Sequence, residues 1–408
     1  MSKLIITRME TPTGKRLMNA LEEGGRIRRL YPVEEEEACP LNRILTGRVE
    51  RIVPGQHAAF VRIGPDQRGY LHLKEEPYVI YADGKTGGTQ TSSERKLKAG
   101  DAILVQICRE AMKGKLPGLT ARLSIPLRGL VLTADPGERG ASSKLPARER
   151  TRLLTLMDQL SAERYPQGRP FGFILRTNAC GMTKEQLLEE YTELERLYTE
   201  VFVNGRHRTD GSIVYDPEPP VTRMIRDIKA ADLEKILTDD RQLYERIGGY
   251  LSCHIPELAD RLTLYDDRLL PLPALFSLGK VLEEALGKRV WLKGGGFLVI
   301  EQTEAFVSID VNSGKDLKGN EAQETYRRIN LEAASEIARQ LRLRELSGMI
   351  LIDFITMKEK ESSEELLGAL RSHVRNDHVP TNVVDMTPLG IVEVTRRRQC
   401  RPLAEAMR

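Results

Sequence analysis

The chain has 408 residues, 40% of them hydrophobic and 30% charged, a composition typical of a globular protein with a substantial core. Its net charge of +3 is nearly balanced, so charge alone does not indicate a polyanionic partner. The five cysteines include no C-x-x-C pair, which argues against a disulfide framework or a cysteine-rich zinc site. Because no segment is long and apolar enough for a signal peptide or a membrane span, we expect a cytoplasmic protein.

The first quarter of the chain is predicted to be mainly β. Residues 1–38 indicate two short strands around a turn. Residues 42–75 alternate short strands with Pro-Gly and Gly-Pro-Asp turns, which is typical of a small antiparallel barrel. After a polar loop at 83–95, residues 101–110 supply a further strand.

Two helices are predicted next, over residues 146–165 and 183–202, the second with Thr183 as its N-cap. The strand between them is expected to end on Arg176 and Thr177.

The last part of the chain has the order of an α/β layer. After a mostly helical region at 222–287, a Gly-rich turn leads into two strands that form a hairpin. A long helix over 321–345 then precedes the strand "MILIDF". A helix at 361–376 and the strands "NVVDMT" and "GIVEVTRR" complete the alternation, which predicts a sheet with a buried middle.

Two acids stand at the ends of apolar strands in this layer, Asp310 in "SIDVNSG" and Asp353 in "MILIDF". A parallel crossover through the intervening helix would place the two strand ends at one edge of the sheet. Two close carboxylates repel unless a proton or a cation lies between them, and oxygen ligands without His or Cys favour Mg²⁺, or alternatively Mn²⁺, over zinc. Asn312 projects from the same side and can hydrogen-bond either Asp310 or a substrate. The alternative is that both acids cap helices or pair with arginines.

Four blocks of the sequence closely resemble the ribonuclease E/G family. They are "GRVERIVPGQHAAFVRIGPDQRGYLHLK", "GGGFLVIEQTEAFVSIDVNSGK", "NLEAASEIARQLRLRELSGMILIDFITM" and "TPLGIVEVTRRRQCRP". The resemblance implies an endoribonuclease that hydrolyses single-stranded, A/U-rich RNA and leaves 5′-phosphate and 3′-hydroxyl ends. Asp310 and Asp353 match the family's ligands for the catalytic magnesium, and Asn312 matches the asparagine that hydrogen-bonds the metal-binding carboxylate.

The resemblance also implies a fold. It is a multidomain α/β chain in which an RNase H-like fold is interrupted by an S1 barrel of the OB type and a 5′-sensor region, and is followed by a DNase I-like α/β subdomain. The implied boundaries are 1–38 and 222–286 for the RNase H-like parts, 39–122 for the S1 domain, 123–221 for the 5′-sensor region and 287–408 for the catalytic subdomain.

Two further groups of residues acquire roles from the resemblance. The RNA-contacting aromatic pair and lysine of the S1 domain are matched by Phe60, Tyr70 and Lys115. Without the resemblance, the alternation of its strand predicts that Phe60 is a core residue. The family's pocket for the 5′-terminal monophosphate of the substrate is matched by Arg176, Thr177 and Val131. The chemistry fits this role, because a guanidinium and a hydroxyl both donate to phosphate oxygens.

Four departures from the family pattern qualify these roles. Leu127 stands where the 5′-phosphate pocket has a glycine, and Thr356 replaces an acid in "DFITM". The family's zinc-binding C-P-x-C motif is absent, since Cys400 stands alone in "RRRQCRP". A homodimer would therefore form by contacts other than zinc. With no long tail after residue 408, we expect a short, G-type member of the family.

The sequence thus predicts a Mg²⁺-dependent endoribonuclease acting on messenger RNA or on ribosomal RNA precursors. The alternatives are a non-catalytic S1-type RNA-binding protein and a metal-dependent DNA nuclease.

Overall fold

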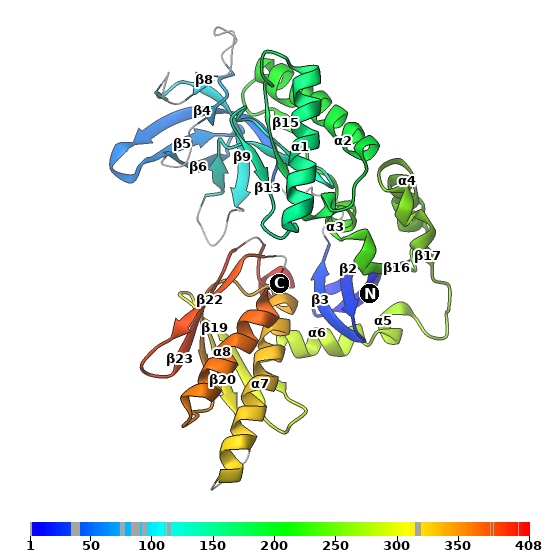
Figure 1. The fold of residues 1–408 in the computed structure, drawn as a ribbon, viewed down its shortest axis with the longest axis vertical. Coiled ribbons are helices and arrows are strands. Elements are labelled where there is room, and N and C mark those ends of the chain that lie inside the picture. The colour runs from blue at the N-terminus through cyan, green and yellow to red at the C-terminus, as the bar shows by residue number, and fades with distance from the viewer. Residues whose placement is uncertain are drawn as a thin grey trace. The chain divides into compact units, whose positions relative to one another are not determined.

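The computed structural model describes residues 2–33, 41–73, 78–82, 90–91, 96–109, 111, 116–314, 320–375, 377, 379–398 and 400–408. The chain divides into two compact units. One, the split unit, combines residues Met1–Val33 with Ala230–Arg408, and the other, the continuous unit, is Glu34–Lys229. Figure 1 shows both units.

The first sheet of the split unit joins the N-terminus to residues more than two hundred positions later. Its strands follow the order β17-β16-β1-β2-β3. They are β1 (Ser2–Thr11), β2 (Gly14–Glu23), β3 (Arg26–Pro32), β16 (Leu233–Thr238) and β17 (Leu262–Leu264). The first three are antiparallel, whereas β1–β16 and β16–β17 are parallel. The accompanying helices are α4 (Arg241–His254), α5 (Leu272–Leu275), α6 (Leu278–Leu286) and α9 (Leu403–Ala406).

The second sheet of the split unit carries the candidate carboxylates. Its order is β18-β19-β20-β21-β23-β22. The strands are β18 (Arg289–Trp291), β19 (Phe297–Gln302), β20 (Val307–Asn312), β21 (Gly348–Asp353), β22 (Thr381–Met386) and β23 (Ile391–Arg396). Helices α7 (Asn320–Leu343) and α8 (Lys360–Val374) pack on one face and bury its apolar side chains, among them Ile309, Ile350 and Ile352. The opposite face carries the exposed side chains.

The continuous unit begins with a five-stranded barrel. The strands β4 (Ile44–Val53), β5 (Ala58–Arg62), β6 (Arg68–His72), β10 (Gly118–Thr120) and β9 (Ala102–Arg109) pair in this order, and β9 closes the barrel on β4. β15 (Ile213–Tyr215) adds to β4, and β7 (Tyr78–Val79) pairs with β8 (Gln90–Thr91). The predicted barrel is confirmed, and Val61, Ile103 and Val105 lie in its core.

A four-stranded sheet with three helices makes up the rest of this unit. The strands β11 (Ser124–Pro126), β12 (Leu130–Thr133), β14 (Gly172–Leu175) and β13 (Arg139–Ala141) follow that order. The helices are α1 (Ala147–Arg164), α2 (Lys184–Leu197) and α3 (Pro220–Asp227). Thr183 is the N-cap of α2 as predicted: it accepts a hydrogen bond from Gln186 N–H, and the Gln186 side chain accepts one from Thr183 N–H, a capping box.

The structure corrects one prediction of secondary structure and adds two strands to another. Residues 1–38 contain a third strand, β2, whose sequence "GKRLMNALEE" is rich in good helix formers but pairs on both edges. The region 222–287 is mostly helical, as expected, and it also contributes β16 and β17 to the first sheet. In both places tertiary pairing outweighs local preference. The finer assignments to RNase H-like and DNase I-like folds, and the five domain boundaries, stay predictions.

In the part of the chain that the structure describes, no helix combines the length and the apolar character needed to cross a membrane.

Candidate functional site

The two strand-end aspartates are direct neighbours in the second sheet of the split unit. β20 and β21 are parallel, and their register pairs Asp310 with Asp353. Adjacent strands are about 4.8 Å apart, so both carboxylates project from adjoining positions on the same sheet face. Both side chains are exposed, while Ile309 and Ile352, one residue earlier, are buried under the helices. The parallel crossover predicted from the sequence is confirmed.

Asn312 completes this group. Its Nδ2 donates a hydrogen bond to Asp310 Oδ2 at 2.7 Å. Because residues two apart on a strand share a face, Asn312 lies beside Asp310 on the side that carries Asp353. The amide occupies one carboxylate oxygen and so limits the orientations that Asp310 adopts.

Backbone contacts fix the chain on both sides of the pair. Asn330 of α7 is fully buried; its Nδ2 donates to the Ile355 carbonyl at 2.8 Å, and its Oδ1 accepts from Ile355 N–H at 3.1 Å. This holds the segment that follows Asp353. On the other strand, a side chain at Gly296 would come within 2.6 Å of the Asn312 carbonyl, so only glycine permits that approach. The aspartates thus stand on a rigid frame.

The donor set suits magnesium better than zinc. Within the described residues, no group of three or more His, Cys, Asp or Glu side chains gathers to hold a metal. What the sheet offers is two adjacent carboxylates with an amide beside them, and Mg²⁺ is commonly bound by one or two carboxylates with water completing the octahedron. The residues therefore fit a magnesium ion held by Asp310 and Asp353.

On the barrel, the two aromatic residues singled out from the sequence form one surface cluster. Phe60 and Tyr70 are opposite each other in β5 and β6, and their rings meet edge to face with centroids 5.9 Å apart. Arg51 of β4 lies across from Phe60, its guanidinium 5.1 Å from the ring centroid. Both aromatic rings are half-buried, so Phe60 is not the core residue that its alternation suggests. Lys115 lies outside the described residues.

Arg176 and Val131 share one face of the four-stranded sheet. Val131 pairs with Ile174, and Arg176 N–H donates to the Gly129 carbonyl at 2.7 Å, which extends the same register. The Arg176 guanidinium donates through Nη1 to the Leu127 carbonyl at 2.6 Å. The position where the family has glycine thus contacts Arg176 through its backbone. Thr177, the next residue, shares a hydrogen bond of 3.0 Å with the Ser142 hydroxyl.

Asp227, which the sequence did not single out, pairs with Arg176. Its Oδ1 accepts from Arg176 Nη1 at 2.9 Å and from Arg226 Nε at 3.0 Å. Burial by itself would raise the pKa of Asp227, but the two guanidiniums outweigh it and hold that pKa below its usual value. A single carboxylate therefore joins two cations.

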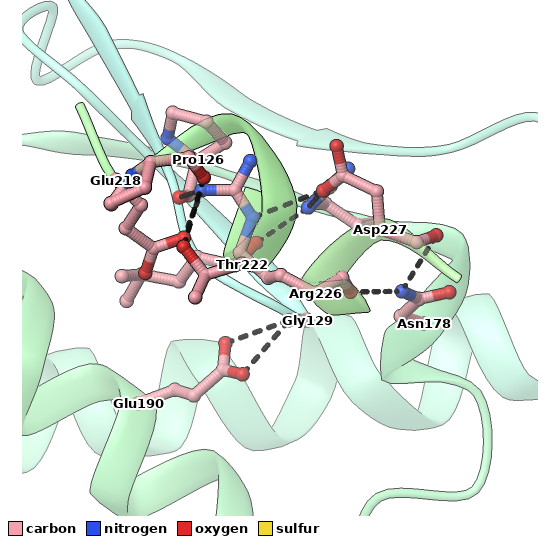
Figure 2. Close-up of polar contacts among 11 residues, drawn as sticks. Pro126, Gly129, Asn178, Glu190, Glu218, Thr222, Arg226 and Asp227 are labelled. Atoms are coloured by element: carbon pink, nitrogen blue, oxygen red, sulfur yellow. Dashed lines mark hydrogen bonds and ion pairs between the residues drawn. The ribbon is translucent and has the colours of Figure 1, made fainter. Parts of the chain in front are cut away.

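Figure 2 shows the contacts of Arg226 and of Glu190 near Asp227. The buried Arg226 also donates to the Pro126 carbonyl at 2.8 Å and to Glu218 at 3.2 Å. Below it, Glu190 of α2 accepts from Gly129 N–H with both carboxylate oxygens, at 2.8 and 3.0 Å. Burial raises the pKa of Glu190 despite this hydrogen bond. These contacts hold the turn from which Leu127 and Gly129 reach Arg176.

The structure therefore brings together the described residues of each predicted group, which leaves out Lys115. Asp310, Asn312 and Asp353 adjoin one another in the split unit, whereas the barrel aromatics and the Arg176 region belong to the continuous unit.

Comparison with known proteins places the chain in a family. A family model described as the Ribonuclease E/G family matches residues 124–399. Ribonuclease G of Salmonella typhimurium (strain SL1344) is 32% identical over 392 residues, which cover 95% of this chain and 78% of that protein. Ribonuclease G of Haemophilus influenzae is 33% identical over 394 residues, with the same coverage of 95% and 78%. Ribonuclease E of a Nostoc species is 32% identical over 369 residues, 89% of this chain and 52% of that protein. The chain belongs to the ribonuclease E/G family.

Proposed function

We propose that this protein is a magnesium-dependent endoribonuclease that hydrolyses single-stranded, A/U-rich RNA to 5′-phosphate and 3′-hydroxyl ends. Membership of the ribonuclease E/G family makes the chain an endoribonuclease. The observation that carries the magnesium part is the parallel register that pairs Asp310 with Asp353.

The three residues divide two tasks between them. Asp310 and Asp353 would hold the cation, and Asn312 fixes Asp310 by donating to Oδ2. When bound there, Mg²⁺ supplies an activated water and neutralises charge on the phosphate. Since both carboxylates are exposed, a phosphodiester can approach them from the open face of the sheet.

The barrel supports single-stranded RNA as the substrate. An aromatic pair on the strands of a small barrel offers surfaces on which unpaired bases stack, and a neighbouring arginine adds attraction for phosphate. Phe60, Tyr70 and Arg51 have this arrangement. Lys115 is proposed to contribute charge beside them.

Arg176 and Thr177 are proposed to bind the 5′-terminal monophosphate, with Val131 beside them on the sheet. Arg176 Nε and Nη2 make no hydrogen bond within the described part of the chain, so these two nitrogens are the proposed donors to an anion. The Thr177 hydroxyl is the second donor. Substrates in the cell would be messenger RNA in decay or precursors of ribosomal RNA.

The test is cleavage of a 5′-monophosphorylated, A/U-rich oligonucleotide with Mg²⁺, with Mn²⁺, or with a chelator. Wild type is compared with Asp310→Asn, Asp353→Asn and the control Glu301→Gln. Glu301 is an exposed acid of the neighbouring strand, paired with Lys288 at 2.7 Å. We expect internal cutting that needs the metal and both aspartates but not Glu301. If wild type binds the oligonucleotide and never cuts it, the chain is an RNA-binding protein, and preferential cutting of a DNA oligonucleotide would identify a DNA nuclease.

A further inference from the structure

A second aromatic cluster lies on the sheet that carries the carboxylates. Trp291 of β18 and Phe297 of β19 are cross-strand partners with ring centroids 5.2 Å apart. The guanidinium of Arg289 lies 4.5 Å from the Phe297 centroid and 5.7 Å from that of Trp291. Trp291 is 67% exposed, which is unusual for the largest apolar side chain.

The strand register places this cluster in line with the site. Trp291 is opposite Phe297, and Phe297 is opposite Asn312 in the next strand. Cross-strand partners project from the same face, so Trp291 shares the face of Asp310 and lies about two strand spacings, roughly 10 Å, from Asn312. A short stretch of single-stranded RNA spans that distance.

The turn that joins β18 to β19 is fixed by hydrogen bonds. Leu292 N–H donates to the Gly296 carbonyl at 2.8 Å. Glu332 of α7 accepts from the backbone N–H groups of Lys293 at 2.6 Å and Gly294 at 2.9 Å. Trp291 and Phe297 flank this turn, so the aromatic surface is ordered before any ligand arrives, which lowers the entropic cost of binding.

The charge around the cluster suits a polyanion. Lys288, Arg289 and Lys293 lie on or beside β18, and Glu301 is already paired with Lys288. The barrel shows the same combination in Arg51, Phe60 and Tyr70, where an arginine lies over one ring of an aromatic pair. Single exposed hydrophobic residues need no explanation, but an ordered aromatic pair with an arginine in line with two carboxylates is a specific arrangement.

We propose that the exposed face of Trp291 stacks on an unpaired nucleobase of the RNA next to the bond that is cut, with Phe297 and Arg289 supporting the ring. Stacking of bases on aromatic side chains tolerates any base, so the platform would position the strand rather than select a sequence. This inference rests on the proposed function, because it assumes that single-stranded RNA crosses this sheet face.

Trp291 is the sole tryptophan of the chain, so its fluorescence reports directly on the platform. The experiment uses the Asp310→Asn protein, which we expect not to cut, and titrates it with a single-stranded RNA oligonucleotide in Mg²⁺. A dye-labelled copy of the oligonucleotide measures binding independently by anisotropy. An oligonucleotide of equal length and charge with abasic positions throughout is the matched ligand control.

We expect RNA to quench the Trp291 emission with the same midpoint as the anisotropy change, and the abasic strand to leave the emission unchanged. In the otherwise wild-type enzyme, Trp291→Ala should raise KM by about 5- to 150-fold, the equivalent of one stacked base, while Trp291→Phe retains most of the affinity. Met349→Ala, which removes an exposed but non-aromatic side chain from the same sheet face, should behave as wild type.

Binding of RNA without quenching, or quenching by the abasic strand, would overturn the platform and leave the proposed nuclease intact. A wild-type protein that does not cut RNA would instead refute the proposed function, which cleavage assays detect without reference to Trp291. A Trp291→Ala enzyme with unchanged KM and an unchanged melting temperature would also overturn the platform.

Discussion

Asp310 and Asp353 are register partners in parallel strands, although 43 positions separate them in the chain. The helix α7 returns the chain between them, and its buried Asn330 ties down the segment after Asp353. In the proposed function these two carboxylates hold one cation, so they should act as a unit rather than as two independent contributors.

The first prediction is that Asp310 and Asp353 contribute to cleavage as one unit. Asp310→Asn and Asp353→Asn should each reduce cleavage by more than about 100-fold, because each removes a proposed ligand of the metal rather than a side chain that only orients a ligand. The double variant should cleave no more slowly than the worse single variant, within about threefold, since one lost ligand already disables the site. Single-turnover cleavage at saturating enzyme measures this, and multiplicative losses would show that the two acids act separately.

Asn312 should have a smaller effect. Asn312→Ala leaves both carboxylates but removes the donor to Asp310 Oδ2. Loss of such an orienting contact typically costs about 10- to 100-fold in metal affinity or activity, so higher Mg²⁺ should restore part of the rate. Ser308→Ala, on the same strand and face, is the control. A Mg²⁺ dependence identical to that of wild type would remove Asn312 from the site.

Phe60 and Tyr70 should contribute to RNA affinity. Replacing either ring with alanine should weaken binding by about 1–3 kcal/mol, the range for one stacked base, and Tyr70→Phe should bind almost as well as wild type because the ring remains. The effect should fall on KM and spare kcat. Since the two rings also stabilise each other by about 0.5–1.5 kcal/mol, melting temperatures must be compared. An equal loss in Tyr70→Phe would point to the hydroxyl instead of stacking.

The sequence could predict the carboxylate group because the chemistry follows a regular pattern. Apolar strands that end in Asp310 and Asp353, with a long helix between them, leave few arrangements other than a parallel pair. The barrel could be predicted equally well, because Pro-Gly and Gly-Pro-Asp turns separate its short strands. Strand β2 was missed because Leu, Met, Ala and Glu favour helices, and only pairing with β1 and β3 makes the segment extended.

No comparable sequence pattern predicts the contacts between residues that are distant in the chain. Asp227 follows Arg176 by 51 positions, and nothing in "RMIRDIK" indicates which cation its carboxylate meets. Trp291 stands in a three-residue strand, where alternation is too short to tell an exposed tryptophan from a core one. Both features depend on which strands and helices become neighbours, and that is a property of the fold as a whole.

Asp227 should stabilise the fold in a pH-dependent way. In the folded protein its pKa is held below the unfolded value of about 3.9, so the ionised carboxylate stabilises the folded state. This contribution to stability is fully present at pH values above the unfolded pKa. That contribution is lost as the pH falls through the folded pKa. Urea unfolding should therefore show a constant stability gap between wild type and Asp227→Asn from about pH 5 to 8, which narrows below about pH 4. Asp66→Asn, an exposed acid, is the control, and a gap that widens in acid would contradict the assigned direction.

Arg396 should be among the costliest single positions for stability. Its side chain is 1% exposed and donates through Nε to Asp377 at 2.8 Å and through Nη1 to Glu345 at 3.2 Å, two carboxylates that are themselves buried. Arg396→Met would leave both acids inside the protein without that guanidinium, which typically costs about 3–5 kcal/mol. Arg398→Met removes an exposed arginine two residues later and should change stability by less than about 0.5 kcal/mol. Urea titrations followed by circular dichroism measure both. Equal stability of the two variants would show that the acids become protonated or reach solvent when Arg396 is removed, whereas a large loss confined to Arg396→Met would establish that this buried group fixes the end of β23 beside β21.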